Sequence, residues 1–207
     1  MVIDTLIDLS HHNENVDFAA ARQAGIVAAI LKATEGATWR DVTLPVRRKA
    51  ARDAGLLVGL YHYVSGVDVT KQLANFLDYA KPADDELVAI DFEDSSVGAN
   101  MTLAQLETLV ILMNDQLGRY PVVYGGALLR EAIGNKTNAL LSKCPLWYSR
   151  YATMPIGIPT KVWPSYTLWQ YTDGEHGPEP RATAGIGPCD RNRFNGTTAE
   201  LRKRWPL

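Results

Sequence analysis

The stretch Leu87-Val-Ala-Ile-Asp-Phe-Glu93 joins a short apolar run to two carboxylates. Four consecutive apolar residues followed directly by an acid are typical of a strand that is buried on both faces and ends at a polar edge. Residues i and i+2 of a strand point to the same side, so the side chains of Asp91 and Glu93 are expected to face one cleft. This stretch therefore predicts a buried strand with a pair of carboxylates at its carboxyl end.

Similar apolar runs recur along the whole chain and predict eight strands. They cover residues 6–9, 26–31, 57–64, 87–92, 121–124, 146–151, 166–171 and 189–194. Helix-like patterns separate the early strands, over residues 17–24, 44–54, 69–79, 103–117 and 127–141, the last interrupted at Gly134. Strands that alternate with helices favour a mostly parallel sheet wound by helices.

The last third of the chain breaks this alternation. Segments 152–165 and 172–188 each contain three prolines, so neither is expected to hold a helix. The final strands are then joined by loops, and some run antiparallel. We predict an α/β fold, an irregular TIM-like β/α barrel with an incomplete helix complement of about five helices. The alternative is an open doubly wound sheet, but no glycine-rich phosphate loop follows the first strand.

Composition limits the class of protein. The chain has 207 residues, 46% of them hydrophobic, which fits one domain over 1–207 with no appended binding module. A net charge of −2 excludes the basic surface with which proteins grip nucleic acid, and no apolar run is long enough to span a bilayer. We expect a monomer. The first residues carry acids where a signal peptide needs a basic segment, and Cys144 and Cys189 are expected to be reduced core thiols.

Carboxylates follow several of the predicted strands. They are Asp8, Glu35, Asp91, Glu93, Asp173 and Asp190. Catalytic groups of β/α barrels lie at the carboxyl ends of strands, so these acids are expected to converge on one mouth. Two close carboxylates repel, which keeps one protonated as a general acid while the other stays charged. Glycoside hydrolysis uses this division of roles, whereas the alternative for such a pair is a strand-end salt-bridge cluster.

Aromatic and amide side chains near the strand ends are candidates for binding a sugar, because rings stack on apolar sugar faces. The candidates are Tyr61, Tyr63, Tyr124, Tyr148, Trp169 and Gln170. Strand alternation turns about half of the aromatic residues in these strands away from the cleft. No metal site is expected, since the adjacent His11 and His12 should point apart on an extended chain. No serine-hydrolase elbow is present, and no histidine is placed to activate Cys189.

Eight short blocks in order resemble family 25 of the glycoside hydrolases, the N-acetylmuramidases that cut bacterial peptidoglycan. They are Ile7-Asp-Leu-Ser-His11, Leu31-Lys-Ala-Thr-Glu-Gly36, Gly55-Leu-Leu-Val-Gly-Leu-Tyr-His62, Ile90-Asp-Phe-Glu93, Pro121-Val-Val-Tyr124, Leu146-Trp-Tyr, Leu168-Trp-Gln-Tyr-Thr172 and Asp190-Arg-Asn-Arg-Phe-Asn-Gly196. The blocks cover nearly the whole chain. The fold of this family is an irregular β/α barrel that lacks several helices, which agrees with the prediction above.

The resemblance implies roles for the acids. Glu93 would be the general acid and Asp91 its partner, either stabilising the oxocarbenium-like centre or orienting the 2-acetamido group of the substrate as nucleophile. Asp8 and Asp190 would complete an acidic floor that tunes pKa values and holds geometry. Glu35 also matches a family motif, as a residue near the substrate for which structural hydrogen bonding is the favoured role.

The implied reaction is hydrolysis of the β-1,4 bond between N-acetylmuramic acid and N-acetylglucosamine, with peptidoglycan strands as partner and no cofactor. The alternatives are another barrel glycosidase acting on chitin-like chains and a non-catalytic barrel that binds wall glycan. The missing signal peptide suits a phage endolysin, made in the cytoplasm and released at lysis, and equally a secreted enzyme without its leader. The native-looking Met1 favours the endolysin.

Overall fold

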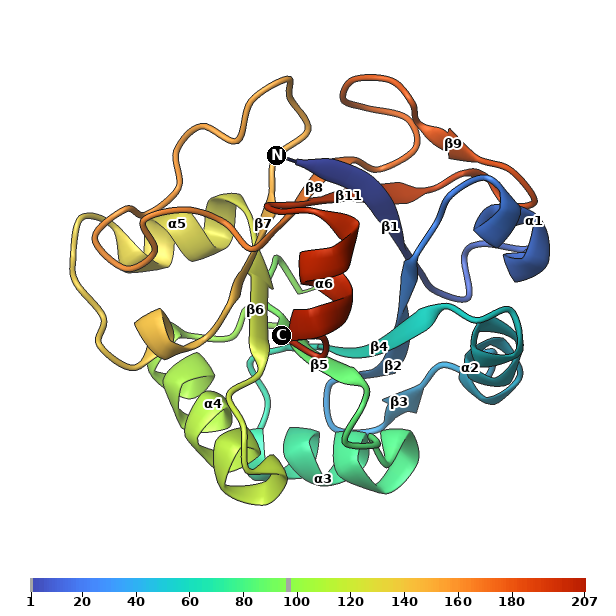
Figure 1. Cartoon of the computed structure of the whole chain (residues 1–207). Helices are drawn as coiled ribbons and strands as arrows, with labels where there is room; N and C mark the ends of the chain where they lie inside the picture. The colour runs from blue at the N-terminus through green and yellow to red at the C-terminus, as the bar shows by residue number, and fades with distance from the viewer. Residues whose placement is uncertain (1, 96–97) are drawn as a thin grey trace.

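The computed structural model describes residues 2–95 and 98–207, and in these ranges the strands close into a barrel (Figure 1). The eight barrel strands are β1 (Ile3–Leu9), β2 (Ala28–Glu35), β4 (Leu57–Tyr63), β5 (Leu87–Asp91), β6 (Val122–Gly125), β7 (Leu146–Ser149), β8 (Leu168–Thr172) and β11 (Asp190–Phe194). Their spatial order is β1-β11-β8-β7-β6-β5-β4-β2, and β1 also pairs with β2. The predicted barrel is therefore confirmed, and the open sheet is wrong.

The direction of the strands changes where the prolines concentrate. From β1 through β2, β4, β5, β6 and β7 to β8, neighbouring strands are parallel. β11 runs antiparallel to both of its neighbours, β8 and β1. The loop that connects β8 to β11 carries only the two short strands β9 (Ala182–Thr183) and β10 (Gly187–Pro188). An antiparallel last strand was expected, because a parallel one needs a helical crossover.

Helices cover the outside of the early part of the barrel. They are α1 (Phe18–Gln23), α2 (Leu44–Asp53), α3 (Val69–Ala80), α4 (Leu103–Leu117) and α5 (Ala127–Ile133). α5 ends before the predicted boundary, because Gly134 takes a positive φ of 57°; a single 3-10 turn follows at Leu141–Lys143. The two-residue strands β3 (Trp39–Arg40), β9 and β10 and the helix α6 (Thr198–Arg204) were not predicted.

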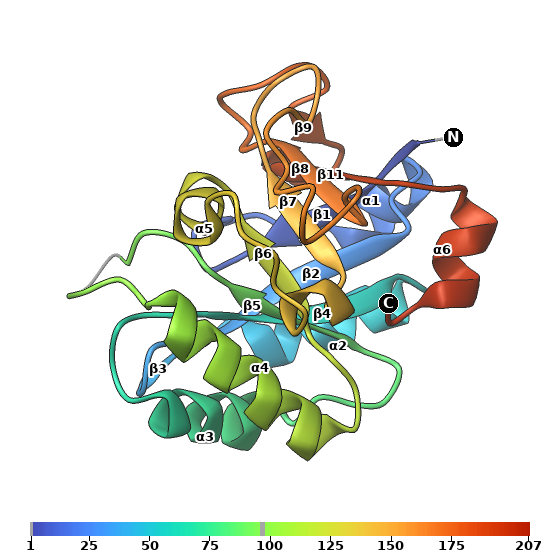
Figure 2. The ribbon, with the colours of Figure 1, turned by 90° about the vertical axis from the view of Figure 1, so that its left-hand side faces the viewer.

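Alternation along each strand produces two apolar cores. Leu6, Leu87 and Leu168 fill the inside of the barrel, whereas Ile7 and Ile90 face outward toward the helices. Leu201 of α6 belongs to the inner core. Because α6 follows the strand end at which Phe194 pairs with Ile3, it closes the amino-terminal end of the barrel (Figure 2). The carboxyl ends of the parallel strands therefore open at the opposite end, where β3 lies.

Among the described residues, no helix is long and apolar enough to cross a membrane. Both cysteines are buried and free, as expected.

A buried acid fixes the start of β5. Glu86 is fully buried directly before this strand and accepts hydrogen bonds from Nε of Arg48 at 2.7 Å, Nε of Arg52 at 3.1 Å and the amide of Ala83 at 3.0 Å. Both arginines belong to α2, so the network ties this helix to the strand that ends at Asp91.

Replacing Glu86 with Ala is expected to destabilise the fold by about 3 kcal/mol, because two guanidinium groups lose their buried carboxylate. The midpoint of thermal unfolding should fall by roughly 6–12 °C. Asp53→Ala is the matched control, since it removes only the exposed pair with Lys49 and should cost under about 1 kcal/mol. Equal melting temperatures for the two variants would contradict this role of Glu86.

Candidate active site

The register of the strands gathers three aspartates at the open end of the barrel. Asp8 of β1 pairs directly with Asp190 of β11, so their side chains share one face of the sheet. Asp91, the last residue of β5, lies beside Tyr63 of β4 and Tyr124 of β6. Asp91 continues the inward-facing series of Leu87 and Ala89 in the same strand. The predicted convergence of strand-end acids is therefore present for these aspartates.

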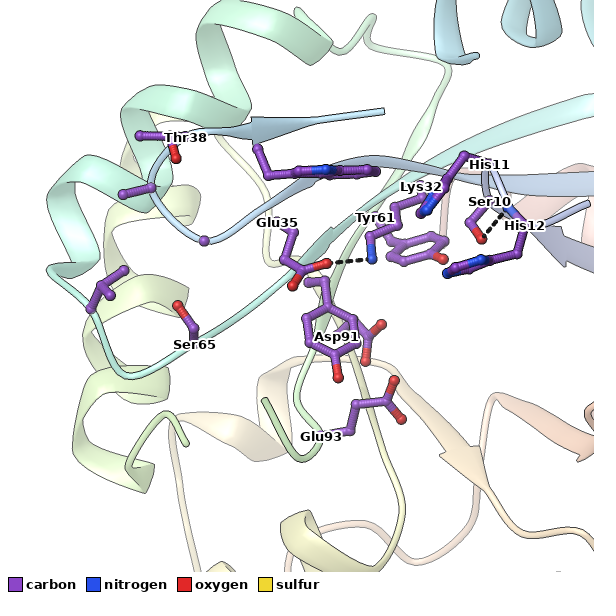
Figure 3. A pocket seen from close by; sticks show the side chains of 15 residues that line it. Ser10, His11, His12, Lys32, Glu35, Thr38, Tyr61, Ser65, Asp91 and Glu93 are labelled. Carbon is purple, nitrogen blue, oxygen red and sulfur yellow. Dashed lines mark hydrogen bonds and ion pairs between the residues drawn. The ribbon is translucent and has the colours of Figure 1, made fainter. Parts of the chain in front are cut away.

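Glu93 follows two residues later and faces the same hollow as Asp91 (Figure 3). This hollow has a volume of about 740 Å³, and Tyr61 and Tyr63 also line it, as the sequence predicted. The paired placement of Asp91 and Glu93 follows from the i, i+2 spacing along an extended chain.

Asp8 is held in place by amide side chains. Nε2 of Gln170 lies 3.1 Å from both carboxylate oxygens, and Nδ2 of Asn192 donates to Oδ2 at 2.7 Å. The amide oxygen of Gln170 accepts in turn from the hydroxyls of Tyr124 at 2.7 Å and Tyr151 at 3.1 Å. Tyr124 and Gln170, two of the predicted substrate-binding residues, thus form a buried network that orients Asp8.

Burial and mutual repulsion raise the pKa values of all four acids. Burial raises the pKa of Glu93 to about 7, and the charge of Asp8 adds to the shift. Burial raises the pKa of Asp8 to about 6 against the hydrogen bonds from Asn192 and Gln170. The pKa of Asp91 lies well above its usual value because of burial and the nearby Glu93, and that of Asp190 is raised by burial and Asp8. The site therefore retains protons near neutral pH.

Oδ1 of Asp91 is buried and has no hydrogen-bond partner within residues 2–95 and 98–207. A buried carboxylate oxygen without a donor is costly, so this atom is suited to accept a hydrogen bond from a ligand.

A buried cation lies on the other side of the hollow. Nζ of Lys32 pairs with Oε2 of Glu35 at 2.7 Å (Figure 3). The ammonium group also lies 5.0 Å from the ring centre of Trp39 and 4.5 Å from that of Tyr63. Its charge lowers the pKa values of Asp91 and Glu93 and so opposes the effect of burial. Glu35 lines the hollow as predicted, in an ion pair that fits a structural role.

Histidines and a tryptophan complete the wall of the hollow. The sequence prediction that His11 and His12 point apart is wrong, because the chain turns after Ser10 and the two ring centres lie 3.9 Å apart. The ring of Trp39 lies 4.8 Å from that of His11. Trp39 was not predicted, because the two-residue strand β3 contains no apolar run from which a strand could be predicted. Within the described residues, no group of three or more His, Cys, Asp or Glu could hold a metal ion.

Two predicted aromatic residues lie outside the barrel. Nε1 of Trp169 donates to the carbonyl of Arg150 at 2.8 Å, and the hydroxyl of Tyr148 donates to the carbonyl of Ile156 at 2.9 Å. Both rings belong to the outer core, away from the hollow. Because Gln170 faces inward, its neighbour Trp169 must face outward, and Tyr148 pairs with Trp169 in register. The expectation that they line the cleft is corrected accordingly.

Asp173 lies near enough to Asp190 for its charge to raise the pKa of that acid, but its own oxygens are engaged within a loop. It accepts hydrogen bonds from the amides of Glu175 at 2.9 Å and His176 at 2.6 Å, and its other oxygen pairs with Nδ1 of His176 at 2.8 Å. Its carboxylate thus serves to shape the loop after β8.

A second hollow of about 500 Å³ continues the first beyond Glu93. Its lining includes Arg130, Ser149, Arg150 and Tyr151. Tyr63 and Glu93 belong to the walls of both hollows, so Glu93 lies between them. The two together form a cleft that extends to both sides of this acid.

A closed β/α barrel, four crowded carboxylates with raised pKa values and an aromatic-lined cleft define the class of barrel glycoside hydrolases. The model of glycosyl hydrolases family 25 matches residues 7–179. The chain belongs to this family and is a glycoside hydrolase.

Individual relatives agree with the family. Lysozyme M1 of Streptomyces globisporus is 27% identical over 94% of this chain and 69% of its own length. An N,O-diacetylmuramidase of Arthroderma benhamiae is 28% identical over 80% of this chain and 75% of its own length. Among solved structures, a family 25 lysozyme from Aspergillus fumigatus superposes with a TM-score of 0.82 at 29% identity, covering 98% of each chain.

The crowded acids predict how stability depends on pH. A carboxyl whose pKa is higher in the folded state binds protons that the unfolded chain releases, so stability is lost as the pH rises from about 4 through about 7. Glu93→Gln removes one such group and should raise the midpoint of thermal unfolding by roughly 3–8 °C at pH 8, with little change at pH 4.

The control is Asp115→Asn, which neutralises an exposed acid and should shift neither value. Melting temperatures that differ equally from wild type at pH 4 and pH 8 for Glu93→Gln would contradict the raised pKa.

Proposed function

We propose that this protein is a lysozyme that hydrolyses the β-1,4 bond between N-acetylmuramic acid and N-acetylglucosamine in peptidoglycan, with Glu93 as general acid. The observation that carries the proposal is the pKa of Glu93, raised to about 7, beside Asp91 in a cleft that extends to both sides. Relatives named lysozyme and muramidase support peptidoglycan as the substrate and the bacterial cell wall as the place of action.

Cleavage begins with a proton on Glu93. Its carboxyl group donates this proton to the glycosidic oxygen as the bond to the anomeric carbon breaks, and positive charge develops on the sugar ring. Water later attacks the anomeric carbon and returns a proton to Glu93. The raised pKa serves this cycle, because Glu93 must hold a proton near neutral pH and also accept one.

Asp91 supplies the matching negative charge. Its Oδ1, which has no partner among the described residues, is suited to accept a hydrogen bond from the N–H of the 2-acetamido group of the substrate. Such a bond stabilises ionised Asp91, so the proton that the pair shares stays on Glu93. It also orients the acetamido oxygen toward the anomeric carbon, where it acts as the internal nucleophile. Asp91 thus favours participation by the substrate over direct attack by a carboxylate.

Asp8 and Asp190 contribute to the negative electrostatic potential of the site. The charge of Asp8 raises the pKa values of Glu93, Asp91 and Asp190. Gln170 and Asn192 fix the position of Asp8, so the field that keeps Glu93 protonated is built into the strands.

The rings that line the first hollow are suited to the sugar units. Tyr61, Tyr63 and the partly exposed Trp39 are suited to pack against the apolar faces of sugar rings.

Glu93→Gln tests the proton donor. The variant should lose roughly 10²–10⁴-fold in kcat on purified cell walls, because an amide keeps the shape of the side chain and donates no proton to the leaving oxygen. Release of reducing ends is the measurement, with Asp115→Asn as the control at the wild-type rate. Lysis at the wild-type rate by Glu93→Gln would refute the assignment, and new reducing ends of N-acetylglucosamine would refute the muramidase reaction.

The pH profile of kcat/KM tests whether the charge of Asp8 raises the pKa of Glu93. Activity should decline above about pH 7, as Glu93 loses its proton. Asp8→Asn keeps an oxygen acceptor for Gln170 and removes the charge, so the alkaline limb should move to lower pH. An unchanged limb would show that Asp8 does not raise the pKa of Glu93.

A further inference from the structure

The second hollow contains two arginines without a carboxylate partner. Within the described ranges, the side chain of Arg150 makes no hydrogen bond or ion pair, and its Nε is buried. Among the described residues, Arg130 donates only to the hydroxyl of Tyr148, at 3.3 Å. Both arginines line the part of the cleft beyond Glu93, where Arg130 also borders a neighbouring hollow at Gly157, and most of their donors are unused within the described residues.

Several other partly buried arginines of the described residues have carboxylate partners, and Arg193 lies over the rings of Trp169 and Tyr171. Arg48 and Arg52 bind Glu86, and Arg191 binds Asp4 at 3.1 Å and the hydroxyl of Tyr171 at 2.9 Å. A buried guanidinium donor without a partner costs free energy in the absence of a ligand. Arg150 departs from this pattern at the cleft.

The remaining polar groups of the hollow are occupied or turned away. The hydroxyls of Ser149 and Tyr151 both contact the amide oxygen of Gln170, at 3.3 and 3.1 Å. Asp94 also lines the hollow, but its Oδ1 accepts from Asn100 at 2.7 Å. Neither Asp94 nor Glu93 forms an ion pair with the arginines in the described part of the chain. Among the described side chains that line this hollow, those of Arg130 and Arg150 thus hold the unused donors.

We propose that Arg130 and Arg150 form a carboxylate-binding subsite for the acidic groups that peptidoglycan carries and chitin lacks. A guanidinium group presents a planar fork of donors that matches a carboxylate. The proposal rests on the lysozyme function proposed above and deepens it. The carboxylate has two sources: the peptide stem, or the lactyl group of muramic acid where no stem is attached to it.

The test compares wild type, Arg150→Gln, the double variant Arg130→Gln/Arg150→Gln and the control Arg202→Gln. Arg202 is exposed on α6, which closes the opposite end of the barrel. Three substrates are used: peptide-bearing glycan strands, strands stripped of peptide by an amidase so that the lactyl carboxylate is free, and peptide-bearing strands with every carboxyl converted to an amide. KM and kcat are measured from the release of reducing ends.

The double variant should raise KM about five- to tenfold on peptide-bearing strands, change kcat less than about twofold, and match wild type on the amidated strands. A raised KM on peptide-bearing strands but not on stripped strands assigns the subsite to the stem. A raised KM on stripped strands but not on peptide-bearing strands assigns it to the lactyl group, whose carboxyl is an amide wherever the stem is attached. Arg202→Gln should match wild type throughout.

Equal loss on carboxylated and amidated strands, or no loss on either, would overturn the subsite. Arg150→Gln removes no hydrogen bond or ion pair of the described residues. This single variant therefore still tests the subsite if Arg130→Gln impairs folding. If the subsite proposal is wrong, the wild-type protein still hydrolyses the strands. If the proposed lysozyme function is wrong, neither the wild type nor any variant hydrolyses any of the three substrates.

Discussion

The pairing of β1 with β11 is the constraint on which the rest of the structure depends. It joins strands from the two ends of the chain and closes the barrel. Its register sets Asp8 against Asp190 at one end and Ile3 against Phe194 at the other. The first contact concentrates negative charge at the open mouth, and the second positions α6 across the opposite end. The register of one antiparallel strand pair thus places both the acids at the open end of the barrel and the helix α6 that covers the opposite end.

Crowding of acids at the mouth opposes folding at neutral pH, and the packing of the barrel compensates. The inner and outer apolar cores fill both faces of the strands, so the backbone that carries the acids has little freedom to relieve their repulsion. Amides and a lysine moderate the repulsion without neutralising it: Gln170 and Asn192 hold Asp8, and Lys32 opposes the pKa shift of Glu93. The site therefore stores unfavourable electrostatic energy, as sites with strongly shifted pKa values do, and the proposed role of Glu93 as proton donor makes use of it.

The sequence was sufficient for the barrel, since β-branched runs, glycine helix ends and prolines are local signals. It was also sufficient for the pair Asp91 and Glu93, whose geometry follows from a spacing of two. The orientation of Trp169 was predictable too, because it adjoins Gln170 and both could not face inward. Trp39 and the contact between His11 and His12 depend on a turn and a two-residue strand, which carry no periodic pattern. Arg130 and Arg150 lie far apart from Glu93 in sequence, and only the folded chain brings them to its cleft.

The position of Glu93 between two hollows has a consequence for how a long polymer is degraded. A pocket closed at one side accepts only the terminus of a chain and shortens it unit by unit. A cleft that continues past the acid on both sides lets a strand lie across it and be severed at an inner bond. Each such event halves a strand rather than trimming it, so a cross-linked mesh loses mechanical strength after few cuts, long before much soluble sugar is released.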